Sequence, residues 1–316
     1  MFSESTFDWW SEAFTWGGVA ATLIATVVAV FEIKARFFDS RIRSKRLMVS
    51  SRYALWDRWR WRGIEFLHNR HFDPEVRDDV QDIRGWVSDW RKARRQGRNE
   101  LDEILICVSK GRIVLGYVYA DYYYGESFMF LSYFVVDGDN QVEKDSVKYK
   151  LIESLMLLSR RDYKNLLGIV TELEEFGKIE RDDELIMVEK GVRLFRNFRI
   201  SVNKINVQWG IKYVFGRLLI DYYQPLLGED EIDLKSTTFG SEKYRLWLVV
   251  VIPQDRVEFI DSKVILSRAR VEEILSFVFK RLYWDAWPTN KYRDYLLREY
   301  EKHVSAVDGD VELFCG

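Results

Sequence analysis

Residues 127–173 decide the fold, and they read SFMFLSYFVV (127–136), DGDNQVEKDSVKYKLIESLMLLSRRDYKN (137–165) and LLGIVTEL (166–173). The first and last segments are rich in β-branched and aromatic side chains, which predicts two strands. Between them, apolar side chains recur on one helical face, at Val147, Leu151, Ile152, Leu155 and Leu158. A helix that connects two strands in this way crosses over the sheet, so we expect the two strands to be parallel.

The residues just upstream extend this sheet. Two β-rich runs, Ile104–Ser109 and Arg112–Tyr119, are separated by Lys110-Gly111, which indicates a hairpin. The order strand, strand, strand, helix, strand predicts a mixed α/β sheet. Further upstream, Leu47 to Trp90 is helical in character, with a break at Asp73-Pro74 where a new helix can start, and a basic loop over 91–99 ends the helical part.

Downstream of the sheet, three more elements are predicted. Tyr244 to Ile252 is an apolar strand ended by Pro253, Val271 to Trp284 is an amphipathic helix, and Asn290 to Ser305 forms a last helix. The closing stretch, Asp308 to Gly316, has no periodicity, and we expect it to be disordered or to bind a neighbour.

The N-terminal region predicts a membrane anchor. Ala13 to Phe31 is a run of nineteen residues without a charge, and a bilayer core of roughly 30 Å needs a helix of about this length. Basic residues then follow at Lys34, Arg36, Arg41, Arg43, Lys45 and Arg46. Positive charge on this side indicates a single pass with the N-terminus outside and the rest cytoplasmic, at the cell inner membrane. The alternatives are a signal peptide, which needs a positive segment where this chain is acidic, and a buried core helix.

Small residues recur along this predicted helix. Gly17, Ala21, Ala25 and Ala29 stand at four-residue spacing, and such faces let another transmembrane helix approach closely. We therefore expect a helix of a larger membrane complex as a partner. The alternative is chance, because so many residues in the run are small.

Composition excludes several classes of protein. A net charge of −2 argues against a general nucleic-acid binder, and two cysteines, Cys107 and Cys315, exclude a disulfide framework. The three histidines form no zinc motif, so no metal site is predicted. The sequence contains no GxSxG motif, no P-loop and no GxGxxG motif.

The order of elements and several local phrases resemble the GNAT superfamily of N-acetyltransferases. Phe72–Arg77 is similar to the first-helix region of some bacterial members, Leu131–Asp137 to their splayed fourth strand, and Asp221–Leu226 and Leu266–Arg268 to later segments. The resemblance implies a GNAT-like domain over 47–288. This domain follows an extracytoplasmic tail at 1–12, a transmembrane helix at 13–33 and a basic segment at 34–46. A C-terminal helix and tail at 289–316 come after it.

Three expectations about a site follow from this resemblance. Members of the family carry a loop written roughly RxxGxG/A after the fourth strand, where backbone N–H groups close on the pyrophosphate of acetyl-CoA. Here the backbone of Val135 and Val136 would face the cofactor, but the loop 137–146 has no glycine after Gly138 and a net charge of about −3, which would repel a pyrophosphate.

The other two expectations concern the acid and the base. The family's tyrosine, which protonates the leaving thiolate, corresponds to Phe195 in Leu194-Phe195, and Phe195 has no hydroxyl. Glu172 and Glu174 are the candidate base for the incoming amine, since alternate residues share a strand face. The alternative for Glu172 and Glu174 is that they are solvated acids near a strand end.

Two functions from different classes fit these observations. The first is an accessory or scaffold subunit of a membrane complex, with a GNAT-like domain that has lost acetyl-CoA chemistry. The second is a membrane-tethered N-acetyltransferase that uses acetyl-CoA. A third, weaker reading is a sensor that binds another ligand at the acidic loop.

Overall fold

We analysed a computed structural model, which describes residues 47–51, 58–72, 78–95, 100–138, 140–174, 182–225, 246–286 and 289–315. The chain divides into two compact units, Met1–Met48 with Ser109–Ile113, and Val49–Val108 with Val114–Gly316. In the smaller unit, the described residues include a turn at Gly111, whose φ is 63°. This turn joins the first two predicted strands and confirms the hairpin.

The predicted membrane-spanning run and its row of Gly17, Ala21, Ala25 and Ala29 lie outside the described residues. Within the part of the chain that the structure describes, no helix is long and apolar enough to cross a membrane.

Among the described residues, one mixed sheet holds ten strands in the order β1-β2-β3-β4-β5-β7-β6-β10-β9-β8. Their bounds are β1 Leu47–Ser51, β2 Leu101–Lys110, β3 Ile113–Tyr123, β4 Phe128–Val136, β5 Gly168–Glu174, β6 Tyr213–Leu218, β7 Leu246–Pro253, β8 Glu258–Ile260, β9 Lys263–Leu266 and β10 Val311–Phe314. β4 and β5 are parallel, whereas β3 pairs with β4, and β5 with β7, in the antiparallel sense. The parallel pair confirms the predicted crossover.

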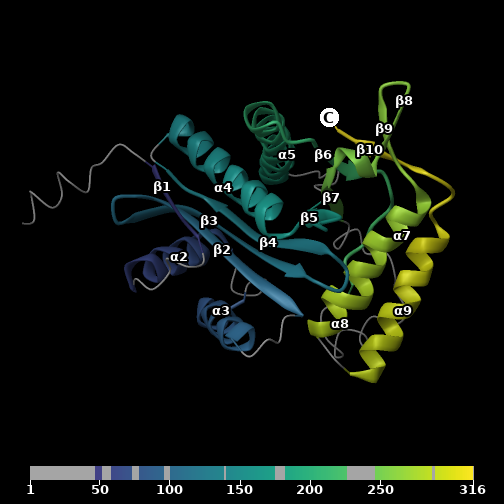
Figure 1. Cartoon of the computed structure of the whole chain (residues 1–316), viewed down its shortest axis with the longest axis horizontal. Coiled ribbons are helices and arrows are strands. Elements are labelled where there is room, and N and C mark those ends of the chain that lie inside the picture. Colours follow the sequence, from purple (N-terminus) through teal and green to yellow (C-terminus); the bar gives the residue numbers. More distant parts are fainter. Residues whose placement is uncertain are drawn as a thin grey trace, which may run out of the picture. The chain divides into compact units, whose positions relative to one another are not determined.

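The helices of the larger unit are α2 Arg58–His71, α3 Val80–Arg95, α4 Gln141–Asp162, α5 Asp182–Trp209, α7 Arg268–Phe277, α8 Tyr283–Ala286 and α9 Asn290–Ser305. α4 and α5 lie on one side of the sheet, and α2 and α3 lie on the other (Figure 1). Two cores result on that second side, one under α2 and α3 and one under α7 and α9. This arrangement is the mixed sheet that the GNAT resemblance implies.

Two predicted boundaries near the start of the domain were wrong. Leu47–Ser51 is a strand rather than part of a helix. The predicted break at Asp73-Pro74 lies outside the described residues. α3 begins at Val80, next to Asp79, whose Oδ1 accepts a hydrogen bond from the Gln81 N–H at 2.7 Å. The basic stretch expected as a loop from Arg91 is helical through Arg95.

The C-terminal part also differs from expectation. The helix predicted from Val271 to Trp284 is α7 followed by a π-helical turn, η4 (Val278–Leu282), and then α8. We expected the closing stretch to be disordered or to bind a neighbour, but it contains β10, which pairs with β6 on one side and β9 on the other. Val311 and Leu313 are buried there, and burial of these two alternate side chains stabilises the strand. Four residues are too few for the sequence to show this periodicity.

Candidate functional site

The parallel pair β4–β5 separates partway along its length. Paired residues are Phe128 with Gly168, Met129 with Ile169 and Phe130 with Val170, yet β4 continues to Val136 and β5 to Glu174. One side-chain bond crosses the opening, from Thr171 Oγ1 to the Leu131 carbonyl at 2.9 Å. We call the region between these two strand ends, residues 131–136 and 171–174, the splay.

A β-bulge in β4 lies at the start of the splay. Tyr119 pairs with Tyr133 while the next residue, Ala120, pairs with Leu131, so Ser132 is the extra residue. Side chains of a regular strand alternate between faces, and an extra residue reverses that alternation. As a result Leu131 and Phe134, three residues apart, both line the same cavity.

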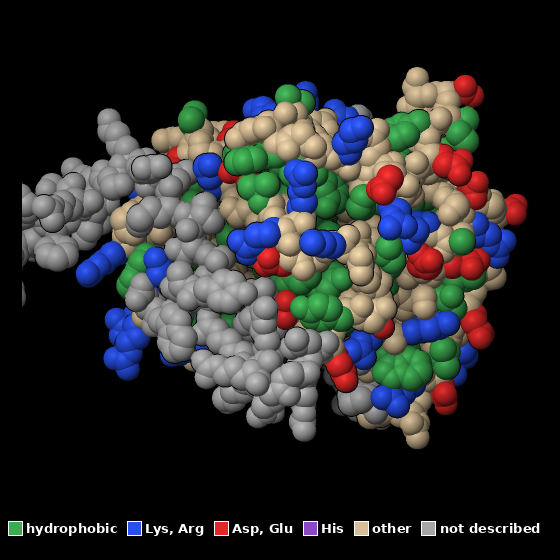
Figure 2. Space-filling view, viewed as in Figure 1, with side chains coloured by type: hydrophobic (Ala, Val, Ile, Leu, Met, Phe, Trp, Pro, Cys, Tyr) green, Lys and Arg blue, Asp and Glu red, His purple; other side chains and the backbone are tan. Residues whose placement is uncertain are grey.

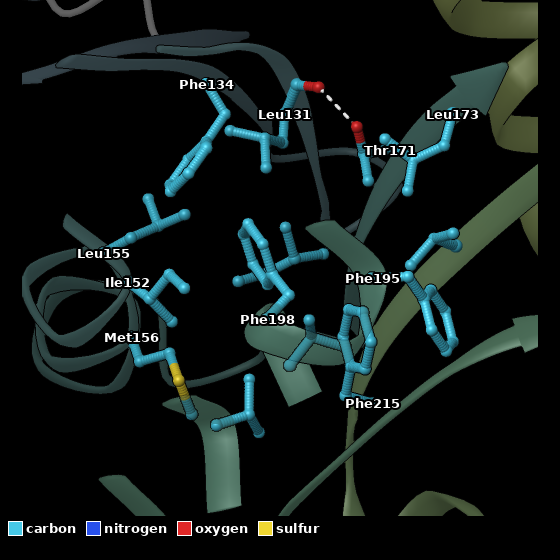
Figure 3. A pocket seen from close by; sticks show the side chains of 14 residues that line it. Leu131, Phe134, Ile152, Leu155, Met156, Thr171, Leu173, Phe195, Phe198 and Phe215 are labelled. Carbon is cyan, nitrogen blue, oxygen red and sulfur yellow. Dashed lines mark hydrogen bonds between the residues drawn. The ribbon is translucent and has the colours of Figure 1, made fainter. Parts of the chain in front are cut away.

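This cavity is a small space at the splay, on the side of α4 and α5, and its volume is about 50 Å³. Aromatic and aliphatic side chains from β4, α4, β5, α5, β6 and β7 converge on it (Figure 3). Phe198 of α5 lies with its ring centroid 4.9 Å from Phe134 and 5.6 Å from Phe215. Thr171 is the polar side chain among the lining residues, and its hydroxyl is the one bonded to Leu131. A site of this composition suits an apolar group and leaves a charged one without partners.

Phe195 lies in the same cavity, on the helix after β5 as the resemblance implies. It is buried, and its ring centroid is 4.8 Å from that of Phe215. A phenyl ring there cannot donate a proton.

The loop between β4 and α4 is the expected cofactor loop. The Gly138 N–H donates to Asp137 Oδ1 at 2.8 Å, and the Glu143 N–H donates to the Asn140 side chain at 3.0 Å. Asp137 also accepts from Arg70 at 2.9 Å. The Glu143 side chain lies against Gly138, 3.3 Å from where a Cβ would stand. Two acidic groups therefore flank the start of α4, and its cap is made by the protein itself.

Val135 and Val136, expected to face the cofactor, end β4 immediately before this loop. Their β3 partners are Tyr117 and Gly116. Val135 is buried in the core under α2 and α3, which is the face away from the cavity.

The face of the sheet opposite the cavity carries a buried acidic cluster that the sequence reading did not identify. Asp121 of β3 accepts a hydrogen bond from Ser132 at 3.3 Å, and the Tyr119 hydroxyl donates to Glu103 of β2. Burial raises the pKa of Asp121 well above its ordinary value, and repulsion from Glu103 raises it further. The available signal was two acids, Glu103 and Asp121, within otherwise apolar strand runs.

Glu172, one of the two candidate bases, lies on the same side of the sheet as that cluster. Its carboxylate accepts hydrogen bonds from the hydroxyls of Tyr222 and Tyr283, the latter at 2.7 Å. Burial raises the pKa of Glu172, and the two tyrosine hydroxyls act in the opposite direction. Glu174 ends β5, and its side chain is outside the described residues.

The structure thus brings some predicted residues together and separates others. Phe195 lines the cavity, with Val135 and Val136 on the β4 strand beside it, whereas Glu172 is on the opposite face near Tyr222. Across the described ranges, no group of three or more His, Cys, Asp or Glu side chains could hold a metal ion.

Comparison with known proteins finds similar solved structures but no similar family or curated protein. The sequence matches no family profile and no curated protein. One similar structure is a chimera of the spermidine N-acetyltransferase of Vibrio cholerae and hSSAT, at 14% identity, TM-score 0.36, and coverage of 66% of this chain and 96% of that one. The aminoglycoside 6'-N-acetyltransferase of Enterococcus faecium has 14% identity, TM-score 0.36, and coverage of 66% and 98%.

A third similar structure is the ribosomal-protein-S5-alanine acetyltransferase of Vibrio fischeri, at 10% identity, TM-score 0.35, and coverage of 66% of this chain and 93% of that one. These neighbours are N-acetyltransferases. At TM-scores below 0.5, the likeness carries no conclusion about activity, substrate or cofactor. The residues themselves define the class: a mixed α/β domain with a splayed parallel strand pair.

Proposed function

We propose that this chain is a membrane-anchored, GNAT-like accessory subunit whose domain has lost acetyl-CoA chemistry. The observation that carries the proposal is the loop at the start of α4. There the N–H groups of Gly138 and Glu143 are already bonded to the protein's own side chains, beside the carboxylates of Asp137 and Glu143. A pyrophosphate needs free donors and a positive surrounding, so the residues present do not fit it.

The splay supports the same conclusion. Phe198 contacts Phe134 of β4 on one side and Phe215 of β6 on the other, and the resemblance aligns Phe195 with the family's proton donor. Filling of this space by aromatic side chains stabilises the domain, and it leaves little room for a cofactor between the strand ends.

The anchor rests on the sequence of residues 13–33, and the partner on the row of small residues along it. Replacing Ala21 and Ala25 by Leu together should separate the helices and release the chain from its complex during purification in mild detergent. The matched control is Val19→Leu with Val27→Leu, because helical periodicity puts these positions on the other side of the predicted helix. If the Ala21/Ala25 variant stays bound at wild-type stoichiometry, docking belongs to the cytoplasmic domain.

One observation favours the alternative, a membrane-tethered N-acetyltransferase. Glu172 is a partly buried carboxylate with a raised pKa, which suits a general base. An acetyl-transfer assay on a panel of primary amines distinguishes the two functions. Activity that is lost in Glu172→Gln would support the enzyme, and absence of activity in the wild-type chain supports the accessory subunit.

A further inference from the structure

The outward face of α2 carries a regular row of basic and aromatic side chains. Arg58, Arg62, Phe66 and Arg70 stand at four-residue spacing and are all exposed, so they form one stripe about 18 Å long at 1.5 Å per residue. The opposite side of the helix is buried on the sheet through Trp61, Ile64, Leu67 and His68. α2 is therefore fixed by one face and presents the other outward.

The charges of this stripe are not needed by the fold. Among the described residues, Arg58 and Arg62 have no ion-pair partner, and like charges four residues apart on a helix repel each other. Arg70 pairs with Asp137 at 2.9 Å but remains 58% exposed. Figure 2 shows Lys and Arg side chains at the edge of the molecule where α2 lies.

Phe66 adds an apolar group at the centre of the stripe. Its side chain is 62% exposed, between Arg62 and Arg70 one turn away on either side. An aromatic ring flanked by arginines on the outer face of a helix is the pattern of helices that lie in a membrane interface, where the ring enters the acyl boundary and the guanidinium groups bind phosphates.

We propose that this stripe binds the surface of an anionic lipid bilayer and lays α2 against it. The inference rests on the proposed membrane anchor, because that anchor supplies the occupant. Arg46, the last of the basic residues after the predicted span, is twelve residues before Arg58, a reach of at most about 43 Å when fully extended. Tethering at this distance gives a high effective concentration of lipid, so a stripe of three arginines and one aromatic ring suffices.

The experiment places an environment-sensitive fluorophore at position 66. The full chain carrying Phe66→Cys, with Cys107→Ser and Cys315→Ser, is labelled and reconstituted into nanodiscs of phosphatidylcholine alone or with phosphatidylglycerol. We expect a blue shift and at least a twofold gain in emission in the anionic discs, and quenching by a nitroxide lipid. A matched probe at Val207→Cys, a position 87% exposed on α5, should not respond.

Charge reversal supplies the second arm. Arg58→Glu with Arg62→Glu should abolish the response of the probe at 66, whereas Arg196→Glu with Lys204→Glu, exposed positions on α5, should preserve it. An equal response at 66 and 207 would overturn the proposal. So would a response of the probe at 66 to single-stranded RNA but not to anionic discs, which would assign the stripe to nucleic acid.

Failure of the anchor is a separate outcome. A chain without an anchor would not co-float with neutral vesicles, whatever the probe at 66 reports. Co-flotation of such a chain with anionic vesicles would still support lipid binding by the stripe if it depends on Arg58 and Arg62. No co-flotation with anionic vesicles would overturn lipid binding by the stripe.

Discussion

At the residue scale, the most unusual feature is the acid pair Glu103 and Asp121, placed side by side on neighbouring strands. Asp121 is 8% exposed, and its pKa is raised by burial first and by Glu103 second. Two close carboxyl groups in a poorly hydrated place cannot both be charged at low cost, so we infer that the fold favours the protonated form of Asp121. Asp121 also accepts a hydrogen bond from Ser132, the extra residue of the bulge beside the splay.

This inference gives a pH-dependent prediction. The folded chain retains the proton on Asp121 to a higher pH than the unfolded chain, whose Asp pKa is about 4. Unfolding therefore releases a proton above that pH, and the contribution of Asp121 to stability falls as pH rises toward its raised pKa. Asp121→Asn keeps the shape of the side chain but replaces the titrating carboxyl group by an amide. The melting temperature of this variant should therefore decline less than that of the wild type between pH 5 and pH 8.

Asp255→Asn is the control for this comparison, because Asp255 is exposed and should leave the slope unchanged. Parallel curves for Asp121→Asn and wild type would show that Asp121 is ionised in the fold.

Thr171 gives a second prediction at this scale. Its hydroxyl donates a hydrogen bond across the mouth of the splay to the Leu131 carbonyl. Thr171→Val keeps the shape and leaves that carbonyl without this donor, which should lower the free energy of unfolding by roughly 1 kcal/mol. Denaturant unfolding measures the change. Thr171→Ser retains the hydroxyl, so its free energy of unfolding should fall only by the contribution of the missing methyl group. If Thr171→Val and Thr171→Ser lose the same free energy, the effect is due to packing and not to the hydrogen bond.

At the scale of elements, α4 packs tightly against β3 at Gly116. A Cβ at Gly116 would stand 2.7 Å from the Val135 carbonyl oxygen and 2.7 Å from Val147, so Gly116→Ala should destabilise the domain by about 1–3 kcal/mol through overpacking. Gly85 in α3 is the matched control, since a Cβ there meets nothing within 4 Å. Gly85→Ala should instead stabilise the helix by up to about 1 kcal/mol. Unfolding curves in which the two variants shift in the same direction would contradict the close packing.

The elements also show what the sequence could and could not predict. Long periodic runs, such as those that became α4 and α9, were predictable because burial of one face dictates their pattern. The bulge at Ser132 was not, since Leu131-Ser132-Tyr133-Phe134 alternates like any strand and the extra residue exists only relative to β3. Likewise β10 spans four residues, and pairing with two distant strands, not its own pattern, makes it a strand.

At the scale of the whole molecule, the C-terminal strand closes the sheet between β6 and β9. Deletion of residues 309–316 removes Val311 and Leu313 from the core, where they are 8% and 2% exposed. Loss of two such side chains should cost roughly 3–6 kcal/mol, seen as a lower denaturant midpoint. Removal of Gly316 alone should leave the midpoint unchanged, and a wild-type midpoint for the longer deletion would mean that β10 contributes nothing to the fold.

The central proposal is that a GNAT-like domain has exchanged cofactor binding for structural packing. Sequence predicted the acidic loop and Phe195. The packing at the splay required the structure because its side chains come from six elements, and the engaged N–H groups required it because their bonds depend on the conformation of the loop. Restoring the loop with Glu143→Gly and Asp145→Gly should raise any cofactor affinity, since it removes two acidic groups and the side chain that lies against Gly138.

The measurement that tests this claim most directly is calorimetric titration of the full chain, in detergent, with acetyl-CoA. We predict no binding heat up to millimolar cofactor, with an identical result for free coenzyme A. Saturable binding of acetyl-CoA at micromolar concentration would contradict the account and restore the N-acetyltransferase alternative.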